Sequence, residues 1–303
     1  MTTLLLSLTI VLAWGSWIPL AQLIPGARQS TRNLYVTGGN VVFATIALFV
    51  GGSAGQVGLG WRDFWLPLAG GVVWTAGSFC AFRATESIGL ARAAGTWTPL
   101  NIIVAFIFGA LLFSELKGMT TARYAIIGGC LVLVLGGVFL IIGSQGSSSS
   151  ANSNASATTT ASPHLGILYA VAAGILWGGF FVPAQWAHVS SQLANFPLSI
   201  GMFLAATALA ARDNGIVKLP RRDTAALLGS GLLFGIGSVT LLGLVSRVGT
   251  GVGFTIAQLS LLVNAGVGIW VFKVPAPGSR AARTASAGIL LAGVGGTIIG
   301  ALR

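Results

Sequence analysis

Charged residues are scarce in this chain of 303 residues. Asp, Glu, Lys and Arg together make up 7% of it, compared with about 25% in soluble domains. Hydrophobic residues make up 54%, and the mean hydropathy is +0.89. So few polar groups cannot coat a water-soluble particle, whereas a lipid bilayer accepts apolar surface. The composition therefore excludes a soluble globular protein and predicts a multi-pass protein of the cytoplasmic membrane.

Reactive side chains are also few. The chain has two cysteines, two histidines and five acidic residues. Cys80 and Cys130 lie in apolar segments, and no His, Cys or carboxylate cluster has the spacing of a metal site. The carboxylates fall at the ends of expected helices or in loops, so no nucleophile, base and orienting group come together. We therefore predict a protein that is not an enzyme and that uses no metal and no cofactor.

Ten apolar segments are long enough to cross a bilayer, which requires about 20 residues. Short loops between them hold most of the charges. The expected helices are residues 3–24, 34–52, 64–83, 90–113 and 122–143, then 164–187, 195–211, 223–245, 249–272 and 282–302. The predicted fold is therefore an all-α integral membrane protein with ten transmembrane helices.

A low-complexity tract divides these segments into two groups of five. Residues 143–163 read GSQGSSSSANSNASATTTASP and contain neither charge nor a hydrophobic face to bury. Such composition is typical of a flexible linker. The predicted organisation is a five-helix repeat over residues 1–142, the linker, and a second five-helix repeat over residues 164–303.

The two halves resemble each other in sequence. Trp14-Gly15-Ser16-Trp17 is echoed 163 residues later by Trp177-Gly178-Gly179-Phe180. Trp74, Gly77 and Ser78 are echoed 160 residues later by Phe234, Gly237 and Ser238. Because each half has an odd number of helices, the second must enter the membrane in the opposite sense. This is the inverted-repeat plan of many secondary transporters, which bind substrate at the repeat interface and work by alternating access.

Several motifs are similar to those of a known family. The Trp-Gly motif of the first helix and Leu-Phe-Ser-Glu at residues 112–115 resemble the drug/metabolite transporter superfamily. Within that superfamily, the chain is most similar to the glucose/ribose porter branch, which includes rhamnose transporters. The residues that carry this similarity are Gly71, Trp74, Gly77, residues 88–93 and residues 113–115. The resemblance covers nearly the whole chain and implies the ten-helix fold and transport of a sugar.

Aromatic and amide side chains inside apolar helices mark the candidate site, because polar groups are costly in hydrocarbon and normally face the protein interior. Trp14, Ile18 and Gln22 share one face of the first helix, and Trp177, Phe181 and Gln185 repeat that spacing in the sixth. In the fourth helix, Trp97 and Asn101 begin a face that corresponds to one bearing Asn264 in the ninth. The candidate substrate-binding residues are Trp14, Gln22, Trp74, Trp97, Asn101, Trp177, Gln185 and Asn264.

These side chains suit a neutral solute rich in hydroxyl groups. Indole faces stack on the apolar faces of sugars, and amides exchange directional hydrogen bonds with hydroxyls. A charged solute would need a buried cation. Arg83 and Arg92 are the candidates, but they lie where their side chains can reach the lipid headgroups. The alternative for the same tryptophans and asparagines is structural, as an interfacial belt and as helix-packing hydrogen bonds.

The predicted function is secondary transport of a small neutral polar solute by alternating access, with a monosaccharide as the first choice. The alternatives are a transporter of the same fold for amino acids or other metabolites, and a membrane scaffold that transports nothing. Proton coupling normally needs an acidic residue or histidine within the membrane. Glu86 and Glu115 are the coupling candidates, and facilitated diffusion stays open. The expected partners are the solute and lipid, without nucleic acid, for a monomer or homodimer.

Basic residues are distributed unequally between the two sides of the membrane. The loops after the first, third, seventh and ninth helices hold eleven: Arg28, Arg32, Arg83, Arg92, Arg212, Lys218, Arg221, Arg222, Lys273, Arg280 and Arg283. The opposite side holds five: Arg62, Lys117, Arg123, Arg247 and Arg303. Short loops rich in Lys and Arg stay in the cytoplasm.

We therefore predict that both termini lie outside and that the Ser-rich linker lies in the cytoplasm. A reporter that is active only in the cytoplasm should be inactive when fused after Arg303 and active when inserted at residue 155. The reverse pattern of activity would contradict this orientation.

Overall fold

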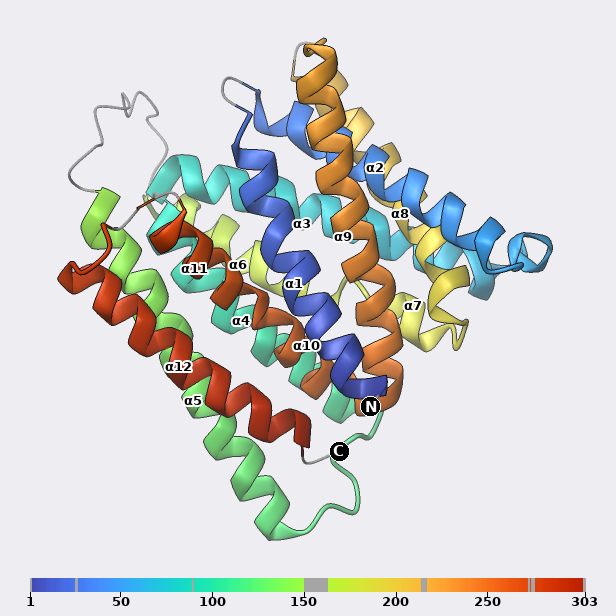
Figure 1. The fold of residues 1–303 in the computed structure, drawn as a ribbon. Helices are drawn as coiled ribbons and strands as arrows, with labels where there is room; N and C mark the ends of the chain where they lie inside the picture. Colours follow the sequence, from blue (N-terminus) through green and yellow to red (C-terminus); the bar gives the residue numbers. More distant parts are fainter. Residues whose placement is uncertain are drawn as a thin grey trace. The chain divides into compact units, whose positions relative to one another are not determined.

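The computed structural model describes residues 2–24, 27–88, 90–149, 163–213, 217–271, 273 and 276–301. Within these ranges the regular secondary structure is helical and contains no strand (Figure 1). The protein is thus all-α, as its composition predicts.

Twelve α-helices make up most of the described chain. They are α1 (Thr2–Gln22), α2 (Gln29–Val50), α3 (Leu66–Ile88), α4 (Leu90–Leu112), α5 (Thr121–Ser149), α6 (Pro163–Gly179), α7 (Val182–Trp186), α8 (Ser191–Arg212), α9 (Arg221–Val248), α10 (Thr250–Gln258), α11 (Ser260–Trp270) and α12 (Arg280–Ala301). A short 3₁₀ turn, η1 (Ala54–Gln56), and a π-helical turn, η2 (Trp61–Trp65), precede α3.

Eight segments of the described chain are long and apolar enough to cross a membrane, which makes this a multi-pass membrane protein. They are Thr2–Ala21, Gln29–Val50, Trp61–Thr85, Thr121–Ser144, His164–Trp186, Ser191–Arg212, Arg221–Val248 and Thr250–Trp270. The other two segments expected from the sequence form α4 and α12. The described apolar part of α4 is only Thr96–Leu112, and several side chains near the start of α4 and the end of α12 lie outside the described residues.

Two of the expected helices are interrupted, which corrects the sequence prediction. The helix expected over residues 164–187 stops after Gly179 and resumes as α7, with Pro183 in its first turn. Proline has no N–H to donate within a helix, and adjacent glycines weaken helix formation, so this break has a local cause. The helix expected over residues 249–272 is interrupted at Leu259, whose N–H bonds Ile256 O at 3.0 Å.

The segment expected to be a linker is partly helical. Helix α5 continues to Ser149, six residues beyond the end expected from the hydrophobic run, and α6 begins at Pro163. Residues 150–162 lie outside the described residues.

The chain forms two compact units. Unit 1 comprises residues 1–76 and 179–247, and unit 2 comprises residues 77–178 and 248–303. Unit 1 therefore holds α1, α2, the first part of α3, α7, α8 and nearly all of α9. Unit 2 holds the remainder of α3 together with α4, α5, α6, α10, α11 and α12. Each unit combines segments from both halves of the sequence, so the compact units do not follow the predicted repeat boundaries.

Glycines bring the helices of unit 1 into backbone contact. Four contacts share one arrangement, in which a glycine lies against a carbonyl of the facing helix and leaves no room for a Cβ: Gly39 on Leu228, Gly231 on Val36, Gly201 on Leu68 and Gly71 on Leu198. The first two contacts join α2 to α9, and the last two join α8 to α3. Close approach at small residues is the usual way for helices to associate in a membrane.

Helices α5 and α12 of unit 2 pack side by side (Figure 1). Gly137 and Gly288 each face the other's carbonyl, and Gly295 faces that of Cys130. The paired residue numbers rise in one helix as they fall in the other, so the two helices run antiparallel. Their partner α4 adds Ile102 to a core that includes Val134 of α5.

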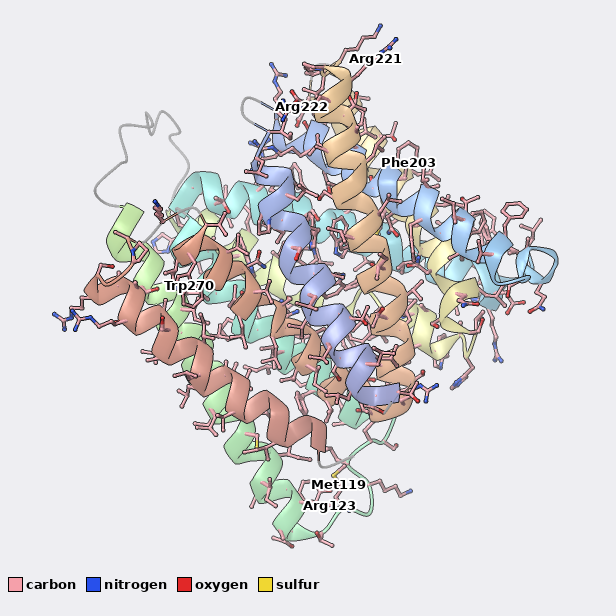
Figure 2. All side chains as sticks on the ribbon, viewed as in Figure 1. Met119, Arg123, Phe203, Arg221, Arg222 and Trp270 are labelled. Carbon is pink, nitrogen blue, oxygen red and sulfur yellow. The ribbon has the colours of Figure 1, made fainter. Side chains whose placement is uncertain are left out.

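Charged and aromatic side chains collect at the ends of helices. Figure 2 shows Arg221 and Arg222 reaching away from the ribbon at the start of α9, and both are exposed. Trp270, at the end of α11, is 63% exposed. These placements are typical of residues at a membrane–water interface.

The glycine contacts predict a graded response to added methyl groups. Gly201→Ala should lower the stability of purified protein by about 1–3 kcal/mol, because its Cβ would overlap the Leu68 carbonyl. Gly229→Ala, in α9 of the same unit, is the matched control, since nothing lies within 4 Å of its Cβ position. Thermal unfolding in detergent measures both variants, and equal midpoints would contradict the packing assignment.

Candidate functional site

An aromatic cluster forms around Phe234 of α9 in unit 1. The Trp14 ring stacks on it with centroids 6.0 Å apart and an interplanar angle of 8°. Trp74 and Trp17 approach Phe234 at 4.9 and 5.1 Å, and Phe180 lies 6.5 Å from Trp14. Four predicted helices thus place aromatic residues in one cluster of the unit 1 core.

The two tryptophans of this cluster that are predicted site residues are buried. Trp14 is 8% exposed and Trp74 is 5% exposed. Trp14 Nε1 donates to Phe234 O at 3.4 Å, and the Trp14 ring fills the space beside Gly237 that a Cβ would occupy. In this conformation both tryptophans pack the core, and stacked Phe234 covers one indole face of Trp14.

A second aromatic pair forms in unit 2. Trp97 of α4 meets Trp177 of α6 edge to face, with centroids 5.5 Å apart and an interplanar angle of 81°. Both side chains are half-buried, so each keeps some accessible surface. Gly77 of α3 supports the pair, because a Cβ there would lie 2.7 Å from Trp177 Cδ1. Of the four predicted site tryptophans, these two are partly exposed, whereas Trp14 and Trp74 are buried.

Asn101 lies one helical turn after Trp97 on the same face of α4. Its side chain is 4% exposed, and its Oδ1 is buried without a hydrogen-bond partner among the described residues. Leaving a buried acceptor unpaired costs roughly 1–3 kcal/mol. Gly178 of α6 lies against the Asn101 carbonyl, where a Cβ would come within 2.7 Å. The geometry therefore leaves a hydrogen-bond acceptor beside the Trp97–Trp177 pair.

The other predicted amides are placed differently. Asn264 of α11 is half-buried, and its Nδ2 donates to Ser260 O at 3.4 Å within its own helix. Gln185 is half-buried in the short helix α7. The side chains of Gln22 and Glu86 lie outside the described residues.

One of the two predicted helical stripes is continuous and the other is not. Helix α1 continues through Trp14 and Ile18, of which Trp14 is buried and Ile18 is 37% exposed. The interruption after Gly179 places Trp177 and Gln185 on separate helices, α6 and α7. A spacing of four residues predicts one face only while the helix continues.

Glu115, a predicted coupling residue, binds the start of α10. Its carboxylate accepts hydrogen bonds from the Thr250 N–H and, at 3.3 Å, from the Gly251 N–H. Gly249 precedes them with φ of +90°, which suits glycine. Carboxylates stabilise helix N-termini because the first N–H groups lack partners and carry partial positive charge. Glu115 thus has a structural role, and its part in coupling stays a prediction.

Metal-binding side chains do not gather in the part of the chain that the structure describes. It has no group of three or more His, Cys, Asp or Glu that could hold an ion. The side chains at both aromatic clusters can make stacking contacts and hydrogen bonds between neutral groups.

Known proteins are similar to this chain over nearly its whole length. A family model described as "Sugar transport protein" matches residues 5–302. The "Putative sugar uptake protein" of Listeria innocua is 25% identical over 98% of both chains. The glucose uptake protein of Bacillus subtilis is 24% identical over 89% of this chain and 88% of its own. A crystal structure with 18% identity covers 100% of this chain and 98% of its own, with a TM-score of 0.73, and shows the same fold.

The contacts of Glu115 predict the outcome of removing its charge. Glu115→Gln should lower stability by about 1 kcal/mol, because a neutral amide caps a helix less well than a carboxylate. Solute uptake should keep the same response to a proton gradient as in the parent protein. Asp213→Asn, with an exposed side chain at the end of α8, is the control. Loss of the gradient response in Glu115→Gln alone would instead assign this carboxylate to coupling.

Proposed function

The chain belongs to the sugar transport protein family, and from this premise we propose that it moves a neutral monosaccharide by alternating access. The protein is a multi-pass sugar transporter of the cell membrane. The name of its Bacillus subtilis relative specifies glucose, which makes D-glucose the first sugar to test.

The half-exposed Trp97–Trp177 pair beside Asn101 carries the proposal. Indole rings bind the apolar face of a pyranose, and the unpaired Asn101 Oδ1 can accept a hydrogen bond from a hydroxyl. Gln22, Gln185 and Asn264 remain further candidates for hydroxyl contacts. We assign Trp14 and Trp74 to holding α1, α3 and α9 together in the conformation described.

The position of Arg83 favours an uncharged solute. Arg83, one of the two candidate cations for a charged solute, is exposed, and its guanidinium lies 5.4 Å from the centre of the Phe79 ring. The side chain of Arg92, the other candidate, lies outside the described residues. An exposed guanidinium can reach the lipid headgroups and does not supply the buried cation that a charged solute would need.

Matching contacts support ten helices arranged as two inverted repeats. That count treats α6 with α7, and α10 with α11, as one interrupted helix each. Gly77 supports the ring of Trp177, and Gly237 supports the ring of Trp14 in the same way. The two glycines are 160 residues apart, and the two tryptophans are 163 residues apart. The glycine contacts of α2 with α9 and of α8 with α3 correspond similarly.

Interrupted helices support alternating access. Secondary transporters commonly build their sites from broken helices, whose free backbone groups and hinges allow rearrangement. Two membrane-spanning segments here are interrupted, at residues 180–181 and at Leu259. The chain also passes between its compact units within α3, after Ala76, and at the end of α6, after Gly178.

Counterflow in proteoliposomes tests the proposal. Purified protein should exchange labelled D-glucose or another monosaccharide, and should not exchange amino acids. Repeating the assay with and without an imposed proton gradient separates facilitated diffusion from proton symport. Exchange of amino acids without sugars, or no exchange of either class, would reject the proposed function.

Variants of α4 test the assigned residues. Asn101→Ala should weaken the apparent affinity for the sugar roughly three- to tenfold through loss of one neutral hydrogen bond. Trp97→Ala should weaken it further, because it removes a stacking surface and opens a cavity. Leu111→Ala, 75% exposed on the same helix, should leave affinity unchanged. Transport kinetics of variants matched for thermal stability decide the matter, and wild-type affinity in Asn101→Ala would make this residue a packing element.

A further inference from the structure

One end of unit 1 is strongly basic. Residues 23–32 cover the connection from α1 to the start of α2, and residues 212–223 cover the connection from α8 to the start of α9. Together they hold two carboxylates, Asp213 and Asp223, and six basic side chains, which gives a net charge of +4. Of the basic side chains, five are exposed and Arg32 is half-buried. We call these six residues the basic patch: Arg28, Arg32, Arg212, Lys218, Arg221 and Arg222.

Hydrogen bonds from two of these arginines hold the patch together. Arg28 Nη1 donates to Asp213 O at 2.8 Å and so joins the two connections, which are 185 residues apart in the sequence. Arg32 Nη2 donates to Ile24 O at 2.7 Å and ties the start of α2 to the residues that precede it. Both acceptors are backbone carbonyls without formal charge, so these contacts position the guanidinium groups and do not neutralise them.

The packing of α2 on α9 brings the starts of these helices to the same level. A Cβ on Gly39 would come within 2.8 Å of Gly231 Cα, and one on Gly235 would come within 2.7 Å of the Phe43 ring. The second contact is four residues later in both helices, so α2 and α9 run parallel. Each helix begins ten residues before the glycine of the first contact. Their N-terminal ends therefore lie side by side.

Helix α8 ends at the same place. A Cβ on Gly51, just after α2, would lie 3.0 Å from Oε1 of Gln192, at the start of α8. At the other end of this pair of helices, Arg28 precedes α2 and contacts Asp213, which follows α8. Helices α2 and α8 therefore run antiparallel, and Arg212 at the end of α8 joins the basic patch.

The opposite end of unit 1 has a different character. There α2 and α9 end, α8 begins, and η2 contacts α8. Its charged side chains are Arg62, Asp63 and Arg247, for a net charge of +1. Trp61 is 69% exposed and Trp186 is 59% exposed at this end. Positive charge is thus concentrated at one end of the unit, and exposed tryptophan at the other.

The basic patch lies at the depth of the lipid headgroups. Gln29–Val50, Ser191–Arg212 and Arg221–Val248 are segments able to span a membrane, and the patch residues lie at or next to their ends. Figure 2 shows Arg221 and Arg222 reaching away from the ribbon. Arginine guanidinium groups match the geometry of phosphate oxygens. The connections that carry the patch are also among those predicted to face the cytoplasm, where anionic lipids attract basic segments.

We propose that the basic patch is a binding surface for the headgroup phosphates of anionic phospholipids. The fold assembles it from two segments distant in the sequence, and the N-termini of two long helices, α2 and α9, add partial positive charge at the same place. The surface lies outside the candidate sugar site, and the proposal does not depend on which solute the protein carries.

A double variant, Arg221→Gln with Arg222→Gln, tests the proposal. Purified full-length protein in neutral detergent is mixed with phosphatidylglycerol or with phosphatidylethanolamine of the same acyl chains, and bound lipid is measured by native mass spectrometry. The parent should prefer phosphatidylglycerol. In the variant its affinity should fall about 25-fold, since each basic residue near a membrane surface contributes a factor of about five. Salt at about 1 M should weaken binding to the parent through screening.

The matched control removes the same charge from the opposite end of unit 1. Arg62→Gln with Arg247→Gln replaces two exposed arginines and should leave the preference for phosphatidylglycerol unchanged. Stability separates lipid binding from a role in folding. Two cations at a helix N-terminus oppose the helix dipole, so the Arg221→Gln, Arg222→Gln variant should be at least as stable as the parent without lipid. Only the rise in unfolding temperature caused by phosphatidylglycerol should shrink.

Three results would overturn the proposal. One is equal affinity for the two lipids in the parent protein. Another is the same loss of phosphatidylglycerol binding in the test variant and in the control. The third is stabilisation of the parent by millimolar inorganic phosphate that matches the effect of phosphatidylglycerol, which would make the patch a site for a soluble anion. Detergent micelles have no sidedness, so a change of membrane orientation cannot produce the expected result.

Discussion

Close backbone contact at glycine is the constraint on which this structure depends. Lipid tails are as apolar as leucine, so burying apolar side chains between helices provides little driving force inside a bilayer. Helices gain instead from dense van der Waals contact, and this requires residues without a side chain where they cross. Gly71 and Gly201 fulfil this requirement between α3 and α8, and Gly137 and Gly288 do so between α5 and α12.

The same constraint positions the aromatic residues. Gly237 leaves room for the indole of Trp14, and Gly77 leaves room for that of Trp177. Glycines therefore have two packing roles in this protein. Some allow close contact with a neighbouring backbone, and others leave room for a neighbouring aromatic ring. The two tryptophans nevertheless differ in exposure, because Phe234 stacks on Trp14 whereas Trp177 meets Trp97 edge to face.

Buried amides without hydrogen-bond partners occur in both units. Most buried polar groups in proteins are hydrogen-bonded, and the buried hydroxyls of Thr37 and Ser199 follow this rule by bonding the backbone of their own helices. Asn101 and Asn195 retain buried atoms without partners in the described part of the chain. A transporter has to hold such groups ready for its solute and protect them from lipid. In the proposed function, a sugar hydroxyl would satisfy the unpaired Oδ1 of Asn101 and remove the energetic cost of leaving it unpaired.

Composition alone determined that the protein is a helical membrane protein, since only 7% of its residues are charged and backbone polar groups in lipid must be satisfied within helices. The motifs also indicated the sugar porter resemblance. Only the tertiary structure decided which of the candidate site residues lie close together. The sequence could not show that Phe234 covers Trp14, that α11 begins anew after Leu259, or that Asn195 lacks a partner. Periodicity reports which face of one helix a residue occupies, whereas pairing and burial depend on segments distant in the chain.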